Sequence, residues 1–214
     1  MPEFCEFPKI PRLSRECVVT EKIDGTNASI HIEQWTGLCP GDGEEQDGSL
    51  CVFLDGEPPA YALRVGSRTR WITPKDDNYG FARWIYDHRV ELIRGLGEGH
   101  HFGEWWGGGI QRKYGLTDKR FSLFNANRWS LDPQGDKQQK PPQCCYVVPV
   151  LYRGMFETNK IRECLESLRL LGSVAAPGFM RPEGVVIYHV AGGLYFKKTI
   201  EKDDEPKSMG APRD

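Results

Sequence analysis

The sequence has no run of about 18 apolar residues, so no segment has the length of a membrane-spanning helix. Its first 16 residues, MPEFCEFPKIPRLSRE, contain no continuous apolar stretch behind a basic start, and no secretory signal is therefore predicted. The sequence also lacks a Cys-x-x-Cys pair, the usual spacing of zinc and redox cysteines, and it lacks an internal repeat. These absences favour a cytoplasmic globular protein with no membrane partner.

The seven cysteines are an odd number in a chain without a secretory signal. We therefore predict reduced cysteines rather than a disulfide framework. Cys39 and Cys51 bracket an acidic loop, and together with the pair His100 and His101 they could form a zinc site. Their spacing matches no standard zinc-ligand pattern, so this alternative is weak.

There is also no excess of positive charge, since the formal net charge is −2. A nucleic-acid partner would therefore need basic residues concentrated on one face. With 214 residues, six Trp, eight Tyr and ten Phe, the chain can build a large core without a metal or disulfide. We expect one domain over residues 1–202 and a polar C-terminal tail over residues 203–214.

Apolar patterning predicts an α+β fold with largely antiparallel sheets and flanking helices. Residues 17–35 are expected to form two strands around a tight turn at Asp24-Gly25, and residues 36–50 a polar loop. Amphipathic helices are predicted from Asn78 to Leu96 and from a capping Thr158 to Leu171. Further strands are expected in the following segments: 50–54, 61–66, HHFGEWWGGG, RFSLFNANRW, GVVIYHV and LYFKKTI.

The segment EKIDGTN, residues 21–27, places Lys22 two residues before an Asp-Gly step. A lysine on a strand is usually exposed and protonated, because its ordinary pKa is about 10.4. A nucleophilic lysine has to lose that proton, and nearby cations or burial favour the loss. A reactive Lys22 therefore predicts other basic residues directed at the same site. Lys-x-Asp-Gly alone is weak evidence, because so short a motif also occurs by chance.

The order of further segments is more specific. EKIDGTN is followed by SRTR, FGEWWG, FSLFNANRW, RPEGVV and YFKKT. This series resembles the motifs of the covalent nucleotidyltransferase superfamily of polynucleotide ligases and capping enzymes. EKIDGTNASI, FGE…GGGIQ and F-x-x-F-N are similar in particular to ATP-dependent RNA ligases of the RNA ligase 2 type. The resemblance covers about residues 17–200 and implies an ATP-grasp-like nucleotidyltransferase domain of two antiparallel sheets.

The resemblance implies that Lys22 attacks the α-phosphorus of ATP, releases pyrophosphate and holds AMP through a phosphoramidate bond. Glu183 would assist a divalent metal, Mg²⁺ or Mn²⁺, at the phosphates. Lys197 and Lys198 would neutralise the phosphates and lower the pKa of Lys22. The family carries Lys-x-Lys here, whereas adjacent lysines on a strand point to opposite faces, so we favour Lys197 as the one that faces the site.

The same resemblance assigns nucleotide binding to a second group of residues. Glu104 would accept hydrogen bonds from the ribose, Phe124 would stack on the adenine, and Arg68 would contact the nucleotide or a 5′-phosphate. Phe121 on the same strand is an alternative to Phe124. The complete predicted nucleotide-binding set is Glu21, Ile23, Asn27, Arg68, Glu104, Phe124 and Glu183.

The expected reaction is ATP-dependent joining of RNA ends, including those of a nicked duplex, as in RNA repair. Family members usually carry a further C-terminal domain, so we expect a minimal form, with an accessory protein or domain as one way to hold substrate. Alternatives are a DNA ligase, a capping guanylyltransferase or a non-catalytic module that binds nucleic-acid ends. A phosphate-binding edge and a solvated loop are equally compatible with four basic residues near the glycine-rich turn: Arg112, Lys113, Lys119 and Arg120.

Overall fold

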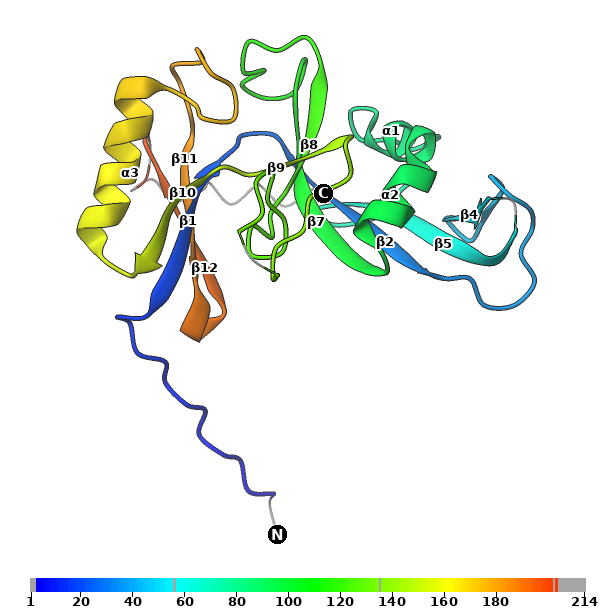
Figure 1. Cartoon of the computed structure of the whole chain (residues 1–214), viewed down its shortest axis with the longest axis horizontal. Helices are drawn as coiled ribbons and strands as arrows, with labels where there is room; N and C mark the ends of the chain where they lie inside the picture. Colours follow the sequence, from blue (N-terminus) through cyan, green and yellow to red (C-terminus); the bar gives the residue numbers. More distant parts are fainter. Residues whose placement is uncertain (1–2, 56, 135, 202, 204–214) are drawn as a thin grey trace, which may run out of the picture. The chain divides into compact units, whose positions relative to one another are not determined.

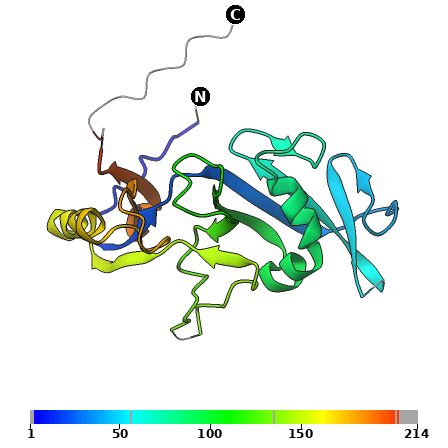
Figure 2. The ribbon, with the colours of Figure 1, turned by 90° about the horizontal axis from the view of Figure 1, so that it is seen from above.

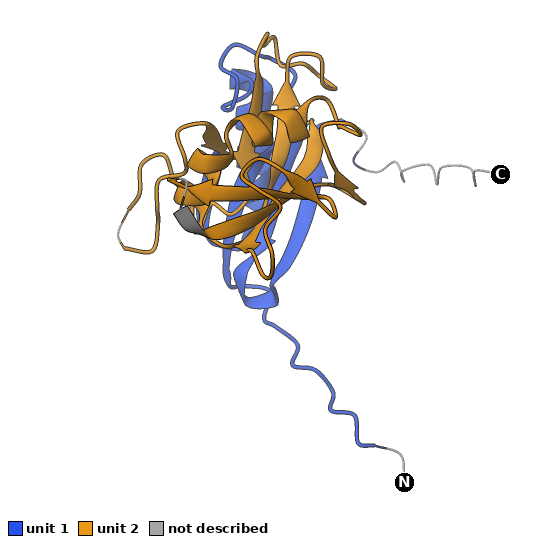
Figure 3. Cartoon of the chain, turned by 90° about the vertical axis from the view of Figure 1, so that its right-hand side faces the viewer, with its two compact units in different colours: residues 1–22, 149–214 blue, residues 23–148 orange. Residues whose placement is uncertain are grey.

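The structure is a computed structural model that describes residues 3–55, 57–134, 136–201 and 203. The chain divides into two compact units, which are coloured separately in Figure 3. Unit 1 comprises residues 1–22 and 149–214, and unit 2 comprises residues 23–148. Unit 2 is therefore inserted in the sequence of unit 1. The predicted division into a domain over residues 1–202 and a tail stays a prediction, because residues 204–214 lie outside the described part.

Unit 1 is a four-stranded antiparallel sheet with one helix on a face (Figure 1). Its strand order is β10-β1-β11-β12. The helix α3 packs on the face formed by alternate residues of β1 and β11, including Cys17, Val19, Val185 and Ile187. The elements are β1 Glu16–Lys22, β10 Val150–Met155, α3 Thr158–Leu171, β11 Gly184–His189, the 3-10 turn η1 Val190–Gly192 and β12 Leu194–Thr199.

Unit 2 is built on a larger sheet whose strand order is β3-β4-β5-β2-β7-β8-β9, with β6 paired to β5. Its strands pair antiparallel except β8 and β9, which are parallel. The strands are β2 Thr26–Gln34, β3 Glu45–Gln46, β4 Ser49–Leu54, β5 Glu57–Ser67, β6 Trp71–Ile72, β7 Gly99–Gly107, β8 Lys119–Leu123 and β9 Cys145–Val147. The helices are α1 Phe81–Asp87 and α2 Arg89–Leu96. The predicted α+β class is confirmed.

The two faces of the larger sheet differ because successive side chains of a strand point to opposite sides. On β2, Ala28, Ile30 and Ile32 join the core cluster that also contains buried residues of α1 and α2. The helices lie along this face in Figures 1 and 2. Asn27 and His31 alternate with these residues and therefore belong to the opposite face.

The predicted tight turn at Asp24-Gly25 is not a hairpin. β1 pairs with β10 and β11, whereas β2 pairs with β5 and β7. The two strands are consecutive in sequence yet belong to different sheets and different units. Alternation of apolar residues identified both strands, but it contains no information about their pairing partners.

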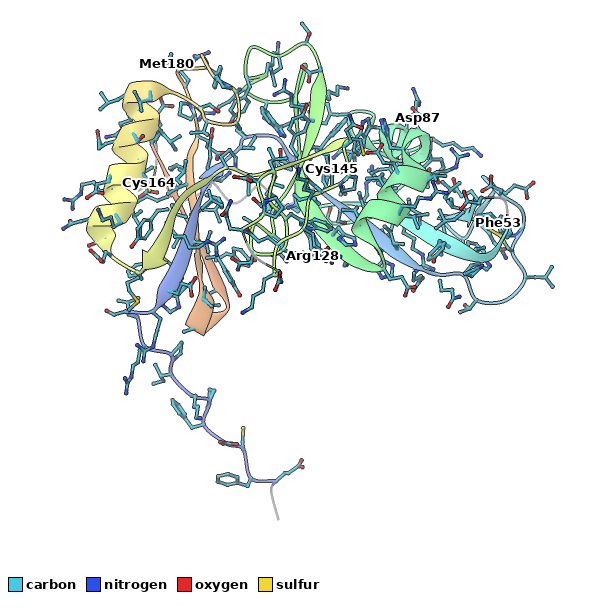
Figure 4. All side chains as sticks on the ribbon, in the orientation of Figure 1. Phe53, Asp87, Arg128, Cys145, Cys164 and Met180 are labelled. Carbon is cyan, nitrogen blue, oxygen red and sulfur yellow. A yellow bond between two sulfur atoms is a disulfide. The ribbon has the colours of Figure 1, made fainter. Side chains whose placement is uncertain are left out.

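Both predicted helices need correction in detail. The segment from Asn78 to Leu96 forms two helices, α1 and α2, because His88 between them has φ −105° and ψ 11°. Thr158 is the first helical residue of α3 rather than its cap, and Leu171 at the end is 75% exposed. Cys164, labelled on α3 in Figure 4, occupies the buried face instead.

The prediction of reduced cysteines is wrong for one pair, because Cys39 and Cys51 form a disulfide. The acidic loop folds back along β4, where Gly43 donates its amide N–H to the Cys51 carbonyl at 2.8 Å and Cys51 donates to the Glu44 carbonyl at 2.8 Å. This local pairing brings Cys39 to Cys51. The same bond removes both thiols from the alternative zinc site. The other five cysteines are free.

No helix in the described part of the chain is long and apolar enough to cross a membrane.

Candidate active site

The predicted site residues fall in both units. In unit 1, Lys22 is the last residue of β1, and its Nζ lies 2.6 Å from Oε2 of Glu183. Both side chains are partly buried, with exposures of 23% and 17%. The sequence predicted other basic residues around Lys22. In the structure the ammonium of Lys22 instead pairs with a carboxylate, that of Glu183.

Glu183 reaches Lys22 because of the strand that follows it. β11 begins at Gly184, which is paired with Lys22 on one side and Thr199 on the other. Gly184 has φ +156°, and a Cβ there would lie 2.2 Å from the Lys198 carbonyl oxygen. The Pro-Glu-Gly segment thus combines a carboxylate with a position where only glycine fits.

The register of the sheet separates the two adjacent lysines of β12. Lys197 pairs with Val186 and Lys198 with Val185, while β11 residues 186 and 185 pair with Thr20 and Glu21 of β1. Lys197 consequently shares a sheet face with Lys22, and Lys198 belongs to the opposite face. Lys198 forms an ion pair with Asp203 at 2.6 Å. The geometry agrees with our preference for Lys197, although the phosphate contact itself stays a prediction.

Glu21 has a different environment from its neighbour Lys22. Its carboxylate is 1% exposed and accepts hydrogen bonds from the Ser173 hydroxyl at 2.6 Å and from the amides of Val174 and Ala175 at 2.8 and 2.9 Å. Burial raises the pKa of Glu21, and these three hydrogen bonds oppose the rise. A nucleotide contact by this residue stays a prediction. The contacts of its carboxylate tie β1 to the loop after α3.

Sequence reasoning missed this loop, because the sequence Ser-Val-Ala-Ala contains no residue that signals an interaction with a buried carboxylate.

In unit 2, Glu104 on β7 holds the Asp-Gly step that follows Lys22 in sequence. Its Oε1 accepts the Gly25 amide N–H at 3.1 Å. A Cβ on Gly25 would lie 2.5 Å from the Trp105 carbonyl oxygen and 2.6 Å from the Trp106 Cβ, so a side chain at this position would displace the segment. The peptide three residues after Lys22 is thereby fixed to β7. A carboxylate has about four acceptor positions, so this bond is compatible with the predicted ribose contact.

The glycine-rich loop after β7 contacts the same segment. The Asp24 amide N–H donates to the Tyr114 hydroxyl at 2.8 Å, and Arg112 forms an ion pair with the Asp24 carboxylate at 3.0 Å. Tyr114 is 2% exposed. Sequence reasoning missed Tyr114, and it assigned Arg112 to a phosphate-binding edge or a solvated loop. The structure uses Arg112 to hold Asp24.

Two other residues of that proposed basic edge, Lys119 and Arg120, also have partners within the protein. Lys119 donates to the Tyr79 carbonyl oxygen at 2.6 Å. Arg120 pairs with Asp118 at 2.8 Å, and its guanidinium lies over the Trp106 and Tyr146 rings.

The remaining predicted nucleotide-binding residues are distributed over the larger sheet. Asn27 is the register partner of Glu104 and shares its face. Phe121 is fully buried in the core, whereas Phe124 is only partly buried and donates its amide to the Phe102 carbonyl at 3.0 Å. These environments favour Phe124 over Phe121 as a stacking residue. The Ile23 side chain is buried and 3% exposed.

Arg68 lies in an exposed bend between β5 and β6 rather than on a strand. A pocket of about 340 Å³ elsewhere in unit 2 is lined mainly by residues of β2, β4, β5 and the loop after β2, among them Glu33, Trp35 and Arg64. None of the predicted site residues lines it.

The part of the chain described by the structure contains no group of three or more His, Cys, Asp or Glu side chains that could hold a metal by themselves. Among the described residues, Glu183 is the one carboxylate that pairs with the Lys22 amine. Mg²⁺ is commonly bound by one or two protein carboxylates together with substrate phosphates, and this donor set fits that arrangement.

Comparisons with known proteins give related solved structures, whereas no curated protein matches. The structure resembles three variants of Naegleria gruberi RNA ligase: one with AMP and Mn, one without ligand, and one with ATP and Mn. Their sequence identities are 16%, 17% and 14%, and their TM-scores are 0.48, 0.48 and 0.45. Each match covers 87% of this chain and 50% of the other, so the chain spans about half the length of these ligases.

The family model described as RNA ligase matches residues 15–201, which include β1 with Lys22 and β12 with both lysines. The match extends over both compact units and over most of the sequence. The chain belongs to the RNA ligase family.

Proposed function

We propose that this protein is an ATP-dependent RNA ligase that forms a covalent Lys22-AMP intermediate. AMP is then transferred to a 5′-phosphate end, which is joined to a 3′-hydroxyl with release of AMP. Membership of the family supports the reaction class. The observation that carries the assignment of the nucleophile is the contact of Lys22 with Glu183 at 2.6 Å.

In the first step, the Lys22 nitrogen forms a bond to the α-phosphorus, and the bond from that phosphorus to the pyrophosphate oxygen breaks. The ammonium must first release a proton, and Glu183 is the acceptor nearest to it. Lys197 on the same sheet face offsets the charge of the phosphates. In unit 2, Glu104 binds the ribose and Phe124 stacks on the adenine. Arg68 contacts the nucleotide or the incoming 5′-phosphate, and Asn27 helps to orient the adenylate with the 3′ end.

A divalent cation, Mg²⁺ or Mn²⁺, belongs to this proposal, and the related ligase structures were solved with Mn. Glu183 would hold it together with the nucleotide phosphates. Once bound, such an ion supplies positive charge to the phosphate oxygens. We also propose a role in RNA repair in the cytoplasm, with an accessory domain or protein that holds substrate. In a reducing cytoplasm the Cys39–Cys51 bond would be open, so that location requires the larger sheet to fold without it.

The decisive experiment is transfer of label from ATP. The purified protein is incubated with α-labelled ATP and Mg²⁺ or Mn²⁺, and the adduct is mapped by mass spectrometry. We expect one AMP on Lys22 and no adduct in Lys22→Ala or Lys22→Arg. Lys160→Ala removes an exposed lysine that pairs with Glu163 on α3, and this matched control should keep the adduct.

The absence of any adduct between pH 6 and pH 9 would contradict catalysis and favour a non-catalytic module that binds ends. Transfer from GTP instead of ATP would indicate a capping enzyme. Joining of nicked duplexes with every combination of RNA and DNA strands then identifies the substrate.

A further inference from the structure

Three exposed or partly exposed rings form a series on the larger sheet of unit 2. The Phe102 and His100 rings of β7 stack with a centroid distance of 4.2 Å and an interplanar angle of 28°. His100 and Trp71 of β6 continue the series at 5.9 Å and 20°. His31 of β2 packs edge-on against His100 at 5.3 Å. We call Phe102, His100 and Trp71 the ring ladder.

The ring ladder lies on the same sheet face as Glu104 and Asn27. On β7, Phe102 and His100 are two and four residues before Glu104 and so point to the same side. Their register partners on β2 are Ser29 and His31, which follow Asn27 with the same alternation. Trp71 pairs with Gly66, where a Cβ would lie 3.4 Å from the Trp71 ring. The ring thus lies at van der Waals distance over the Gly66 backbone, whereas the atom that such a Cβ would displace is the Ser29 Oγ at 2.5 Å.

The rings remain accessible although they pack together. Trp71 is 50% exposed and Phe102 48% exposed, and His100 is also exposed. Large aromatic side chains with half of their surface in water lose the favourable burial that a core position would give them. A structural role alone does not account for a series of stacked and exposed rings on this face.

Two guanidinium groups are next to the Trp71 end of the ladder in sequence. Arg68 and Arg70 occupy the exposed bend that leads directly into Trp71. Arg70 pairs with Asp76, an exposed ion pair of the kind that contributes little to stability. Guanidinium groups next to stacked rings are the combination by which proteins bind single-stranded nucleic acid.

We propose that the ring ladder is a stacking surface for a nucleobase of the RNA substrate, with the adjacent phosphates bound by Arg68 and Arg70. The proposal rests on the proposed ligase function and adds a substrate-binding element to it. Stacking is tolerant of sequence because every base offers a flat face, so the surface binds single-stranded RNA of varied sequence. The occupant is distinct from the adenine of ATP, which we assign to Phe124.

The test measures RNA binding and AMP transfer separately. Binding of a fluorescent, 5′-phosphorylated single-stranded RNA is measured by anisotropy at fixed salt, without ATP. We expect Trp71→Ala to weaken binding about tenfold, the loss of one base-stacking contact, and Trp71→Phe to retain most of the affinity. Phe7→Ala, which removes a 78% exposed ring from the N-terminal segment, is the matched control and should bind as the unchanged protein does.

A second oligonucleotide identifies the group that the rings contact. An abasic RNA of the same length and charge should bind the unchanged protein and Trp71→Ala with equal affinity, because it has no base to stack. Arg68→Ala should weaken binding of both oligonucleotides and reduce the dependence of affinity on salt. The circular dichroism of each variant has to match that of the unchanged protein.

Three results would overturn the proposal: equal RNA affinity of the Trp71→Ala and unchanged proteins, an equal loss on abasic RNA, or a self-adenylation rate that falls as much as RNA affinity. The last result would assign the rings to ATP. If the unchanged protein forms no AMP adduct, the ligase function fails, while the comparison of normal with abasic RNA still tests the ring ladder.

Discussion

The two units differ in the chemistry of the residues they carry. Unit 1 contains Lys22, Glu183 and Lys197, the groups that we assign to the reacting phosphates. Unit 2 contains Glu104 and Phe124 with the ring ladder, which we assign to the ribose and to bases. The residues assigned to the reacting phosphates and those assigned to base recognition thus lie on separate sheets, and each sheet has its own core. Substitutions in unit 1 should mainly lower rates, and substitutions in unit 2 should mainly weaken binding.

Each unit buries a titratable group whose pKa is shifted, and the two shifts differ in direction. Unit 1 buries an acid, Glu21, whose pKa is raised mainly by burial. Unit 2 buries a base, His101, which is 5% exposed and hydrogen-bonded to the Gly97 carbonyl oxygen at 3.0 Å. Burial lowers its pKa, and the contact with the Gly97 carbonyl opposes this. The contributions of Glu21 and His101 to the pH dependence of stability should therefore have opposite signs.

The largest effect is expected from the two adjacent lysines of β12. Lys197→Ala should lower the rate of AMP transfer by about 100-fold, because it removes a cation from the sheet face of Lys22. Lys198→Ala should lower it by less than about threefold, because this lysine lies on the opposite face and forms only a surface ion pair with Asp203. Single-turnover transfer from labelled ATP measures both. The reverse order would show that the register assigned to β12 is wrong in the active protein.

The next effect concerns the stability of unit 1. Glu21→Ala leaves the buried Ser173 hydroxyl and two amides without their acceptor and should lower the free energy of unfolding by about 3 kcal/mol. Glu21→Gln keeps an acceptor and should lower it much less. Urea denaturation provides the measurement.

Because the folded state holds the Glu21 proton more tightly than the unfolded state, the ionised carboxylate destabilises the fold as pH rises through 4.5 and above. Glu21→Gln should thus gain stability relative to the unchanged protein between pH 4 and pH 7. A difference that is independent of pH would contradict the raised pKa.

The smallest effect is expected at His101 in unit 2. The folded state favours the neutral imidazole, so the unfolded state binds more protons below the ordinary pKa of 6.5 and stability falls as pH decreases through that value. His101→Gln should remove this part of the acid sensitivity between pH 7 and pH 5.5. Thermal unfolding at several pH values measures it. His100→Gln is the control. Because His100 is exposed, its substitution should change the pH dependence of stability less than that of buried His101.

Strand alternation and helical spacing located most of the larger elements, but they missed β9 and β10 and merged α1 and α2 into one helix. Strand alternation placed β1, β2, β11 and β12, and the order of the motifs identified the family. Alternation also separated Lys197 from Lys198, because adjacent strand residues point apart whatever the partners of the strand are. Which of the two shares the face of Lys22 follows only from the register of β12.

Pairing between distant segments was beyond the sequence patterns. Alternation reports which residues share a face, but it cannot report that β1 and β2 enter different sheets or that Cys39 returns to Cys51. The partners of Glu21 and Asp24 come from loops after α3 and β7, and no periodicity marks them. The alternation of strand β7 would have distinguished buried His101 from exposed His100.

The insertion of unit 2 within unit 1 has a consequence for synthesis of the chain. β1 leaves the ribosome first, but its neighbours β10 and β11 follow only after all of residues 23–148. Unit 2 is continuous and can complete its sheet co-translationally, whereas β1 waits with both edges unpaired and with Cys17, Val18 and Val19 exposed. Slow elongation between β2 and β10 should therefore lengthen the exposure of this strand and increase aggregation of the nascent chain.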